Sequence, residues 1–176
     1  MPASGTATPQ RTVLLAFDDE VEITQWMKVN DVVMGGMSLS AFEQAGPGIA
    51  RFRGVVSLEN SGGFASVRTS PRRWNSAGAS AFVLRVKGDG RAYKFTVRTD
   101  DGFDGIQYQS RFTPPAGEWH EARLAVASFA ATFRGRIVPG SAPLNPARVR
   151  ALGLMISDRQ AGPFELLVDW IAIEAG

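Results

Sequence analysis

The stretch ARFRGVVSLENSGGFASVR, residues 50–68, decides the fold class of this chain. In its first half, apolar residues such as Phe52 stand at every second position and alternate with polar ones such as Arg53. This two-residue period is typical of a strand with one buried face. The segment ENSGG then supplies turn residues, and a second alternating segment follows, in which Ala65 and Val67 are predicted to face inward. The stretch therefore predicts two strands joined by a glycine-rich turn.

The same alternation recurs along the rest of the chain. A hairpin is predicted where strands over 82–86 and 93–97 meet across Asp89 and Gly90, and a second hairpin turn is predicted over 99–105. Further strands are expected over residues 12–17, 106–112, 119–124, 149–156 and 164–173. Roughly nine strands without a long helix predict an all-β fold, an antiparallel β-sandwich.

Helical structure is expected only in short pieces. Residues 20–28 are predicted to form a short helical turn, and residues 144–149 a one-turn helix start with Asn145 as its cap. Phe129 and Phe133 are predicted to anchor a loop that crosses between sheets.

The length and composition of the chain restrict its class. At 176 residues it is most simply one domain, which we place at 12–176 after a flexible tail at 1–11. It has no cysteine, which excludes disulfides and thiolate chemistry. The formal charge is only +2, and only Arg72 and Arg73 are adjacent among the arginines, so no basic block for nucleic acid is present.

The apolar runs of the sequence are short. None approaches the roughly 20 residues that span a bilayer, so membrane insertion is not expected. The run VLLAF at 13–17 is too brief for the core of a signal peptide. We therefore expect a protein of the bacterial cytoplasm, placed at the periphery of the inner membrane only through a partner.

Two glycine-rich strings, NDVVMGGMS at 30–38 and ENSGGFASVR at 59–68, mark the predicted site. Each has a Gly-Gly pair, and such pairs occur where the backbone takes a positive φ or where another group comes close. The surrounding polar and apolar side chains suit a small polar ligand or a protein partner rather than acid/base chemistry. The candidate contact residues are Trp26, Asn30, Asp31, Met34, Gly35, Gly36, Ser38, Asn60, Gly62, Gly63, Phe64, Arg68, Arg91, Tyr108 and Arg134.

The sequence provides poorly for catalysis. Its one histidine, His120, has no cysteine partner, and no nucleophile elbow, P-loop or dinucleotide motif is present. We therefore predict no enzyme activity and no cofactor. Asp18, after the first strand, and Asp169, in the last, are two plausible ligands of a structural calcium, but calcium takes about six to eight oxygens. The prediction is no metal, with that calcium as the alternative.

Several long strings of the chain carry a family resemblance. In order, they are W..VNDVVMGGMS, F.G.VSLENSGGFASVR, VKGDGRAYKF, YQSRF and FRGR, and the match extends over about residues 17–173. The chain resembles the family of complex I intermediate-associated protein 30, the mitochondrial assembly factor of respiratory complex I, and its bacterial relatives. The resemblance implies a β-sandwich of the galactose-binding-like, jelly-roll type. It also implies a non-catalytic, chaperone-like role in assembling membrane complexes.

The first hypothesis for the site is a protein contact. The glycine-rich strings, with Arg68, Arg91, Tyr108 and the FRGR loop at 133–136, would hold a respiratory-complex subunit or another assembly factor. The chain itself is expected to be a monomer.

Two alternatives remain open at this point. A carbohydrate or other polyol could bind the same face, with Trp26, Trp74 or Tyr108 stacking on the sugar ring. Alternatively, Asp31, Asn60 and Arg68 could form a buried hydrogen-bonded network that fixes the loops and binds no ligand.

Overall fold

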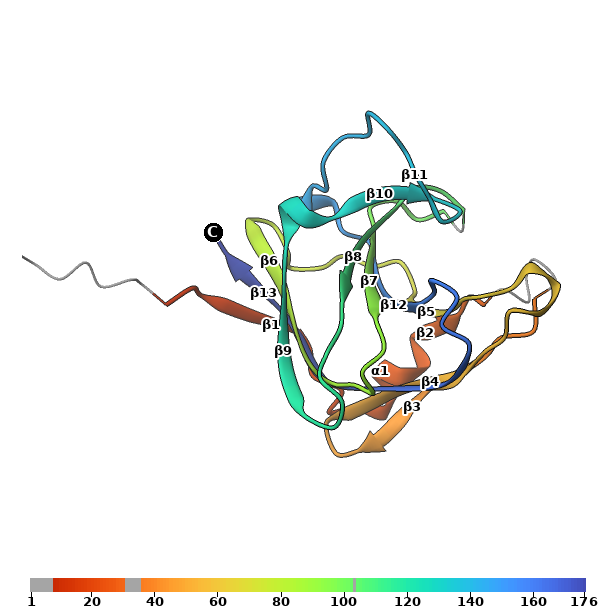
Figure 1. Ribbon diagram of the computed structural model, residues 1–176. Coiled ribbons are helices and arrows are strands. Elements are labelled where there is room, and N and C mark those ends of the chain that lie inside the picture. The colour runs from red at the N-terminus through yellow and green to blue at the C-terminus, as the bar shows by residue number, and fades with distance from the viewer. Residues whose placement is uncertain (1–7, 31–35, 103) are drawn as a thin grey trace, which may run out of the picture.

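The chain folds into two facing antiparallel sheets, as the computed structural model of residues 8–30, 36–102 and 104–176 describes (Figure 1). This confirms the all-β, antiparallel β-sandwich. Three of the predicted contact residues, Asp31, Met34 and Gly35, lie outside the described residues.

Sheet A has six strands, in the order β3-β4-β13-β6-β9, with β1 also pairing β13. The last strand is its centre: β6 follows one edge of β13, while β4 pairs its first half and β1 its second half. The strands of sheet A are β1 (Arg11–Leu15), β3 (Leu39–Gly46), β4 (Ile49–Val56), β6 (Ala79–Lys87), β9 (Trp119–Ala125) and β13 (Gly162–Ala175).

Sheet B has seven strands, in the order β11-β10-β8-β7-β12-β5-β2. They are β2 (Trp26–Lys28), β5 (Ala65–Thr69), β7 (Tyr93–Arg98), β8 (Gln107–Phe112), β10 (Ala130–Phe133), β11 (Arg136–Ile137) and β12 (Ala151–Ile156). The helical elements are α1 (Glu20–Thr24) and the 3₁₀ turns η2 (Glu59–Ser61), η3 (Val126–Ser128) and η4 (Pro146–Arg148). No helix among the described residues is long and apolar enough to cross a membrane.

Aromatic side chains fill the space between the sheets. Phe52 and Phe164 of sheet A meet edge to face, with ring centroids 4.9 Å apart, and the Tyr93 ring of sheet B lies 6.5 Å from that of Phe52. Phe82 of sheet A and Phe95 of sheet B are in contact with tilted rings, whose centroids lie 5.3 Å apart. Because these rings alternate with residues of the opposite face, the two-residue period of the sequence places the core correctly.

The hairpin predicted across Asp89 and Gly90 is wrong. β6 ends at Lys87 in sheet A and β7 begins at Tyr93 in sheet B, so this turn carries the chain from one sheet to the other. β6 lies between β13 and β9, and β7 lies between β12 and β8. Two strands that face each other across a core show the same alternation as two strands that pair, which is why the pattern misled. The turn over 99–105 does join paired strands, β7 and β8, as predicted.

The N-terminal third of the chain differs most from expectation. The helical turn predicted over 20–28 ends at Thr24, and Trp26–Lys28 instead forms β2, paired with β5. Strand β3, Leu39–Gly46, was not predicted, because as an edge strand it is half-buried along nearly its whole length and shows no apolar alternation.

The crossing segment after β9 is also more regular than predicted. Phe129 is 9% exposed and anchors it, but Phe133 is 42% exposed at the end of β10 and anchors nothing. The predicted cap at Asn145 is confirmed, because its side chain accepts a hydrogen bond from the N–H of Ala147 in η4. Short strands at one end of sheet B, β10 and β11, help to raise the strand number to thirteen among the described residues, against the roughly nine predicted from turn spacing.

A buried carboxylate ties the outer strands of sheet A to β13. Glu174 is 3% exposed and accepts hydrogen bonds from Arg123 Nε at 2.9 Å and from Arg11 Nη2 at 3.2 Å. The Arg123 guanidinium, and after it that of Arg11, holds the pKa of Glu174 below its ordinary value, although burial acts in the other direction.

This arrangement predicts an acid-dependent loss of stability. Since the pKa of Glu174 is lower in the folded than in the unfolded state, its contribution is present above the ordinary glutamate pKa of about 4.3 and is lost as the pH falls through the folded value. We expect the Tm of Glu174→Gln to fall less steeply than that of the wild type between about pH 5 and pH 3. Equal slopes in thermal melts would contradict this assignment.

Candidate functional site

The first glycine-rich string begins with a side chain that joins the two sheets. Asn30 Oδ1 accepts a hydrogen bond from the backbone N–H of Ser66 in β5 at 3.2 Å and from the hydroxyl of Ser40 in β3 at 2.9 Å. The N–H of Val29 donates to the Ser66 carbonyl at 2.9 Å, and the Ser66 hydroxyl donates to that of Val29. Because β5 belongs to sheet B and β3 to sheet A, Asn30 holds the two sheets together at this end.

The last residues of the same string also form contacts within the protein. The side chain of Ser38 is fully buried; its hydroxyl accepts the N–H of Ser57 at 3.0 Å and donates to the Ser57 carbonyl at 3.3 Å. Gly36 is buried as well. These positions connect β3 to the chain after β4 rather than present a contact surface.

The Asn30 bridge predicts a clear loss of stability for Asn30→Ala. Removing Oδ1 deprives two partly buried donors of their acceptor, which costs about 1–3 kcal/mol. Ser40→Ala removes only one of the two bonds and is expected to cost about 0.5–1.5 kcal/mol. Urea unfolding at constant m-value measures both, and an Asn30→Ala variant as stable as Ser40→Ala would be evidence against the bridge.

The second glycine-rich string forms the turn that leads into β5. Asn60 takes a left-handed backbone conformation, with φ of 54°, and its side chain is exposed. Gly63 has φ of 141°, a backbone angle that residues other than glycine rarely adopt. The N–H of Gly62 donates to the Glu59 carbonyl at 2.9 Å, and Phe64 is half-buried. Asn60 therefore lies outside any buried network.

Arg68 lies on the outer face of sheet B. Its neighbour Val67 is 1% exposed and points into the core, as predicted. Across the sheet, Arg68 lies between Met27 of β2 and Gly153 of β12. A Cβ at Gly153 would lie 2.4 Å from Thr96 Oγ1 and 3.1 Å from Arg68 Cβ, so only glycine leaves this space open beside Arg68.

Beside Arg68, the turn between β7 and β8 holds a group of ion pairs. Each of its three aspartates is paired with an arginine from a different part of sheet B or its connections. The pairs are Arg98 Nη2 with Asp100 Oδ1 at 3.2 Å, Arg150 Nε with Asp101 Oδ1 at 2.6 Å, and Arg134 Nη2 with Asp104 Oδ2 at 2.5 Å.

These charges act on one another. Burial lowers the pKa of Arg68, and the positive charge of Arg98 lowers it further, while Asp100 and Asp104 act in the opposite direction. The pKa of Asp104 is lowered, mainly by Arg134 and then by Arg98 and Arg68. Two of the predicted contact residues, Arg68 and Arg134, therefore belong to one electrostatic cluster.

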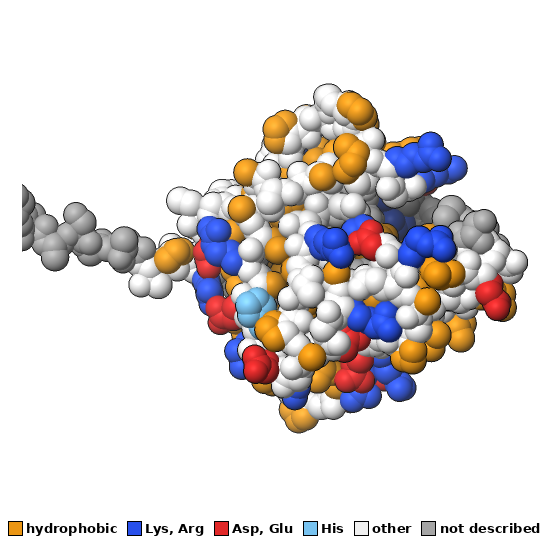
Figure 2. Space-filling view, viewed as in Figure 1, with side chains coloured by type: hydrophobic (Ala, Val, Ile, Leu, Met, Phe, Trp, Pro, Cys, Tyr) orange, Lys and Arg blue, Asp and Glu red, His pale blue; other side chains and the backbone are white. Residues whose placement is uncertain are grey.

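The cluster borders a hollow of about 210 Å³, here called the Arg68–Arg98 hollow. Among its lining residues are Met27, Arg68, Arg98, Asp100, Asp101 and Ala151. Figure 2 shows Lys and Arg side chains gathered around a recess of the surface below β10 and β11. The lining of the Arg68–Arg98 hollow itself carries two arginines and two aspartates, so its charges are balanced.

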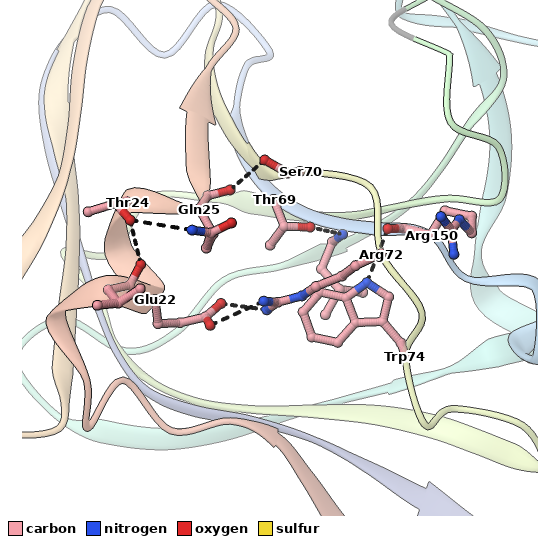
Figure 3. Close-up of polar contacts among 10 residues, drawn as sticks. Glu22, Thr24, Gln25, Thr69, Ser70, Arg72, Trp74 and Arg150 are labelled. Carbon is pink, nitrogen blue, oxygen red and sulfur yellow. Dashed lines mark hydrogen bonds and ion pairs between the residues drawn. The ribbon is translucent and has the colours of Figure 1, made fainter.

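A second polar group lies next to this cluster and was missed by the sequence analysis (Figure 3). Glu22 of α1 accepts hydrogen bonds from Arg72, whose guanidinium lies 4.2 Å from the Trp74 ring centre. Trp74 Nε1 donates to the Arg150 carbonyl at 3.2 Å, and Arg150 in turn holds Asp101. No local pattern signals these contacts, because Glu22 and Arg72 come from distant parts of the chain.

The aromatic candidates for sugar stacking are engaged within the protein. Trp26 is 8% exposed and stacks on Phe42, with ring centroids 4.4 Å apart. Tyr108 is also 8% exposed, and its hydroxyl donates to the Ala142 carbonyl at 2.9 Å. One face of Trp74 is covered by Arg72.

Arg91 lies in a different place from the Arg68 cluster. Its guanidinium donates to the carbonyls of Gln160 at 2.9 Å and Ala161 at 3.1 Å, in the turn between β12 and β13. The structure therefore gives Arg91 a role in fixing this turn.

The sequence singled out two carboxylates as calcium candidates and one histidine, and the structure places all three. In the part of the chain that the structure describes, no three His, Cys, Asp or Glu side chains are grouped to hold a metal ion. Asp169, one of the two calcium candidates, accepts a hydrogen bond from Arg85 at 3.1 Å, and Asp18 lies beside Gly48. His120 is exposed on β9.

Comparison with known proteins decides the family. The family model for complex I intermediate-associated protein 30 matches residues 15–168. The chain belongs to this family. The resemblance carried by the strings around Asn30 and Arg68 is thereby confirmed.

Curated relatives in the complex I intermediate-associated protein 30 family come from fungi and animals. The mitochondrial protein of that name from Neurospora crassa is 29% identical, over 68% of this chain and 49% of its own length. Its mouse counterpart is 25% identical over 98% of this chain and 58% of its own length. The chain thus spans about half the length of the curated relatives it matches.

Solved structures with a similar fold include carbohydrate-binding modules. The family 11 module of a cellulosomal cellulase of Clostridium thermocellum has a TM-score of 0.70 at 14% identity, covering 97% of each chain. A family 29 module has a TM-score of 0.52 at 10% identity, covering 96% of this chain and 87% of the module. These similarities confirm the jelly-roll, galactose-binding-like fold of this family member.

Proposed function

We propose that this protein is a non-catalytic binding protein that assists the assembly of respiratory complex I. It acts by holding a subunit or another assembly factor on the outer face of sheet B. Family membership over residues 15–168 supports the assembly role, since the curated relatives are named for association with complex I intermediates.

The residue composition of the outer face of sheet B favours a protein partner over a carbohydrate. One row across the sheet consists of Met27, Arg68, Gly153, Thr96 and Gln109, which lie opposite one another in register. The next row contains Ser66, Met155, Lys94 and Arg111. Neither row contains an aromatic side chain to stack on a sugar, whereas arginine and methionine are enriched at protein interfaces.

The proposal predicts that Arg68→Ala loses its partner. Tagged protein would be purified from its native cell, and the captured proteins would be quantified by mass spectrometry. Complex I subunits or assembly factors are expected with the wild type and to fall by about 30-fold or more with Arg68→Ala, the effect of losing an interface residue worth about 2 kcal/mol.

Arg85→Ala is the matched control. Arg85 is a half-buried arginine of sheet A, so it tests the same change of residue on the other sheet. Circular dichroism melts would verify that both variants are folded. Equal capture by both variants would show that the outer face of sheet B is not the contact surface. If the wild type captures no complex I component, the proposed link to complex I is wrong.

A genetic arm tests assembly itself. Deleting the gene should leave incomplete subcomplexes of complex I on native gels, and the wild-type chain should restore the full complex while Arg68→Ala should not. Normal complex I in the deletion strain would contradict the assembly role. A shift in Tm with one member of a glycan panel would instead favour a carbohydrate ligand, because a ligand that binds the native state stabilises it.

A further inference from the structure

Arg98 is a buried cation whose hydrogen bonds are incomplete. Its side chain is only 6% exposed. Nη2 donates to Asp100 Oδ1 at 3.2 Å and to the Gly102 carbonyl at 2.8 Å. Nε is shielded from solvent and has no acceptor among the described residues. Leaving a buried donor of a charged group unpaired is costly, so Arg98, which lines the hollow, has hydrogen-bonding capacity beyond its contacts with Asp100 and Gly102.

The space next to Arg98 is kept open by the small residues of β12. Ala151 lies opposite Arg98, and Gly153 lies opposite Arg68, so the strand between the two arginines carries almost no side chain. A Cβ on Gly153 would also come within 2.8 Å of the Val67 carbonyl oxygen, which is backbone and cannot easily move. The Arg68–Arg98 hollow is therefore a built feature of the sheet.

The acidic residues of the hollow do not oppose an anion strongly, since each is already engaged. Asp101 is held by Arg150 Nε at 2.6 Å, and Asp100 accepts from Arg98 and from the N–H of Gly102. Arg68 and Arg98 both line the hollow, and the charge of Arg98 adds to burial in lowering the pKa of Arg68. A negative group between the two guanidinium groups would offset the repulsion between their positive charges.

The size and shape of the hollow select the kind of anion. Its volume of about 210 Å³ is below the roughly 300–1,000 Å³ of typical small-molecule sites, but it admits one side chain. Guanidinium groups match the planar carboxylate with two parallel donors. We propose that the Arg68–Arg98 hollow binds one carboxylate group, supplied by an Asp or Glu side chain of the protein partner. The carboxylate contact deepens the proposed function and rests on it for the identity of the partner.

The test uses the intact, ¹⁵N-labelled protein and follows the Nε–Hε signals of its arginines by NMR. The signal of Arg98 is assigned by its loss in Arg98→Lys. The probes are a blocked tripeptide, acetyl-Gly-Glu-Gly-amide, the same peptide with Gln in place of Glu, and sodium acetate, all at constant ionic strength. A saturable shift of the Arg98 signal with the Glu peptide and none with the Gln peptide is the expected result.

Two variants locate the binding. Ala151→Leu fills the hollow without changing a charge, and Arg98→Lys keeps the charge but loses the paired donors. In Ala151→Leu, the Arg98 signal should need about tenfold more Glu peptide to shift, the equivalent of one charge-assisted hydrogen bond. In Arg98→Lys, the same increase is expected for the shift of the Arg68 signal. Arg85→Ala should bind as the wild type does. Unchanged binding in both hollow variants would overturn the proposal.

The remaining outcomes separate this proposal from the proposed function. No shift with either the Glu peptide or acetate overturns the carboxylate site, whatever the capture experiment shows. Acetate binding as tightly as the Glu peptide overturns the assignment to a partner side chain and indicates a free small carboxylate. If the wild type captures complex I components and a folded Arg98→Lys captures them equally, the carboxylate contact is wrong while the assembly role stands.

Discussion

Gly54→Ala is expected to destabilise the protein by about 3 kcal/mol, because a Cβ at this position would meet backbone. The added atom would lie 2.0 Å from the Leu39 carbonyl oxygen and 2.8 Å from Ser40 Cα. Neither atom belongs to a flexible side chain, so β3 must move away from β4 as a unit. The hydrogen bond from Ser40 to Asn30 would be disturbed with it.

Gly46→Ala is the matched control for this change. Gly46 lies at the end of the same strand, β3, and an added Cβ would have no atom within 4 Å. Its effect is expected to stay within about 0.5 kcal/mol. Urea unfolding gives both values, and amide exchange of β3 should accelerate only in Gly54→Ala. Similar stabilities of the two variants would refute the close approach of β3 and β4.

Phe52→Ala should cost about 3–5 kcal/mol, the usual range for a fully buried phenylalanine. Phe52 is 0% exposed, and its ring contacts that of Phe164 within sheet A and that of Tyr93 in sheet B. Removing it leaves a cavity at the junction of the two sheets. Because β4 is held on both sides by β3 and β13, the surrounding backbone cannot collapse into that cavity.

Phe133→Ala is the control, since Phe133 is 42% exposed at the end of β10. It removes the same number of atoms from a surface position and should change the free energy of unfolding by no more than about 0.5 kcal/mol. A loss below about 1 kcal/mol for Phe52→Ala would show that Phe52 is not part of the structural core.

The fold could be predicted largely because the core residues recur at every second position along the strands. Phe82, Tyr93 and Phe95 all face inward, as their alternation requires. What the period cannot express is which strand pairs with which. The turn at Asp89 illustrates this, since its flanking strands face each other across the core and pair with strands distant in sequence.

The site was predicted only in part, for a related reason. Asn30 and Arg68 stand out because they belong to glycine-rich strings, but the sequence does not reveal that Asn30 bridges two sheets. Arg98 was overlooked because it looks like an ordinary outward residue of a strand. Arg98 is held by the Gly102 carbonyl of the following turn and lies opposite the small Ala151 of β12, and neither contact is a local signal.

The central position of β13 has a consequence during synthesis. Its partners β1, β4 and β6 all leave the ribosome before it, and at roughly 5–20 residues per second they wait several seconds for it to emerge. Throughout that interval the edges of β4 and β6 that β13 will cover are unpaired. The nascent chain therefore passes through a stage in which two apolar strands have unpaired edges that other chains can pair with. Molecular chaperones are most useful to it at this stage.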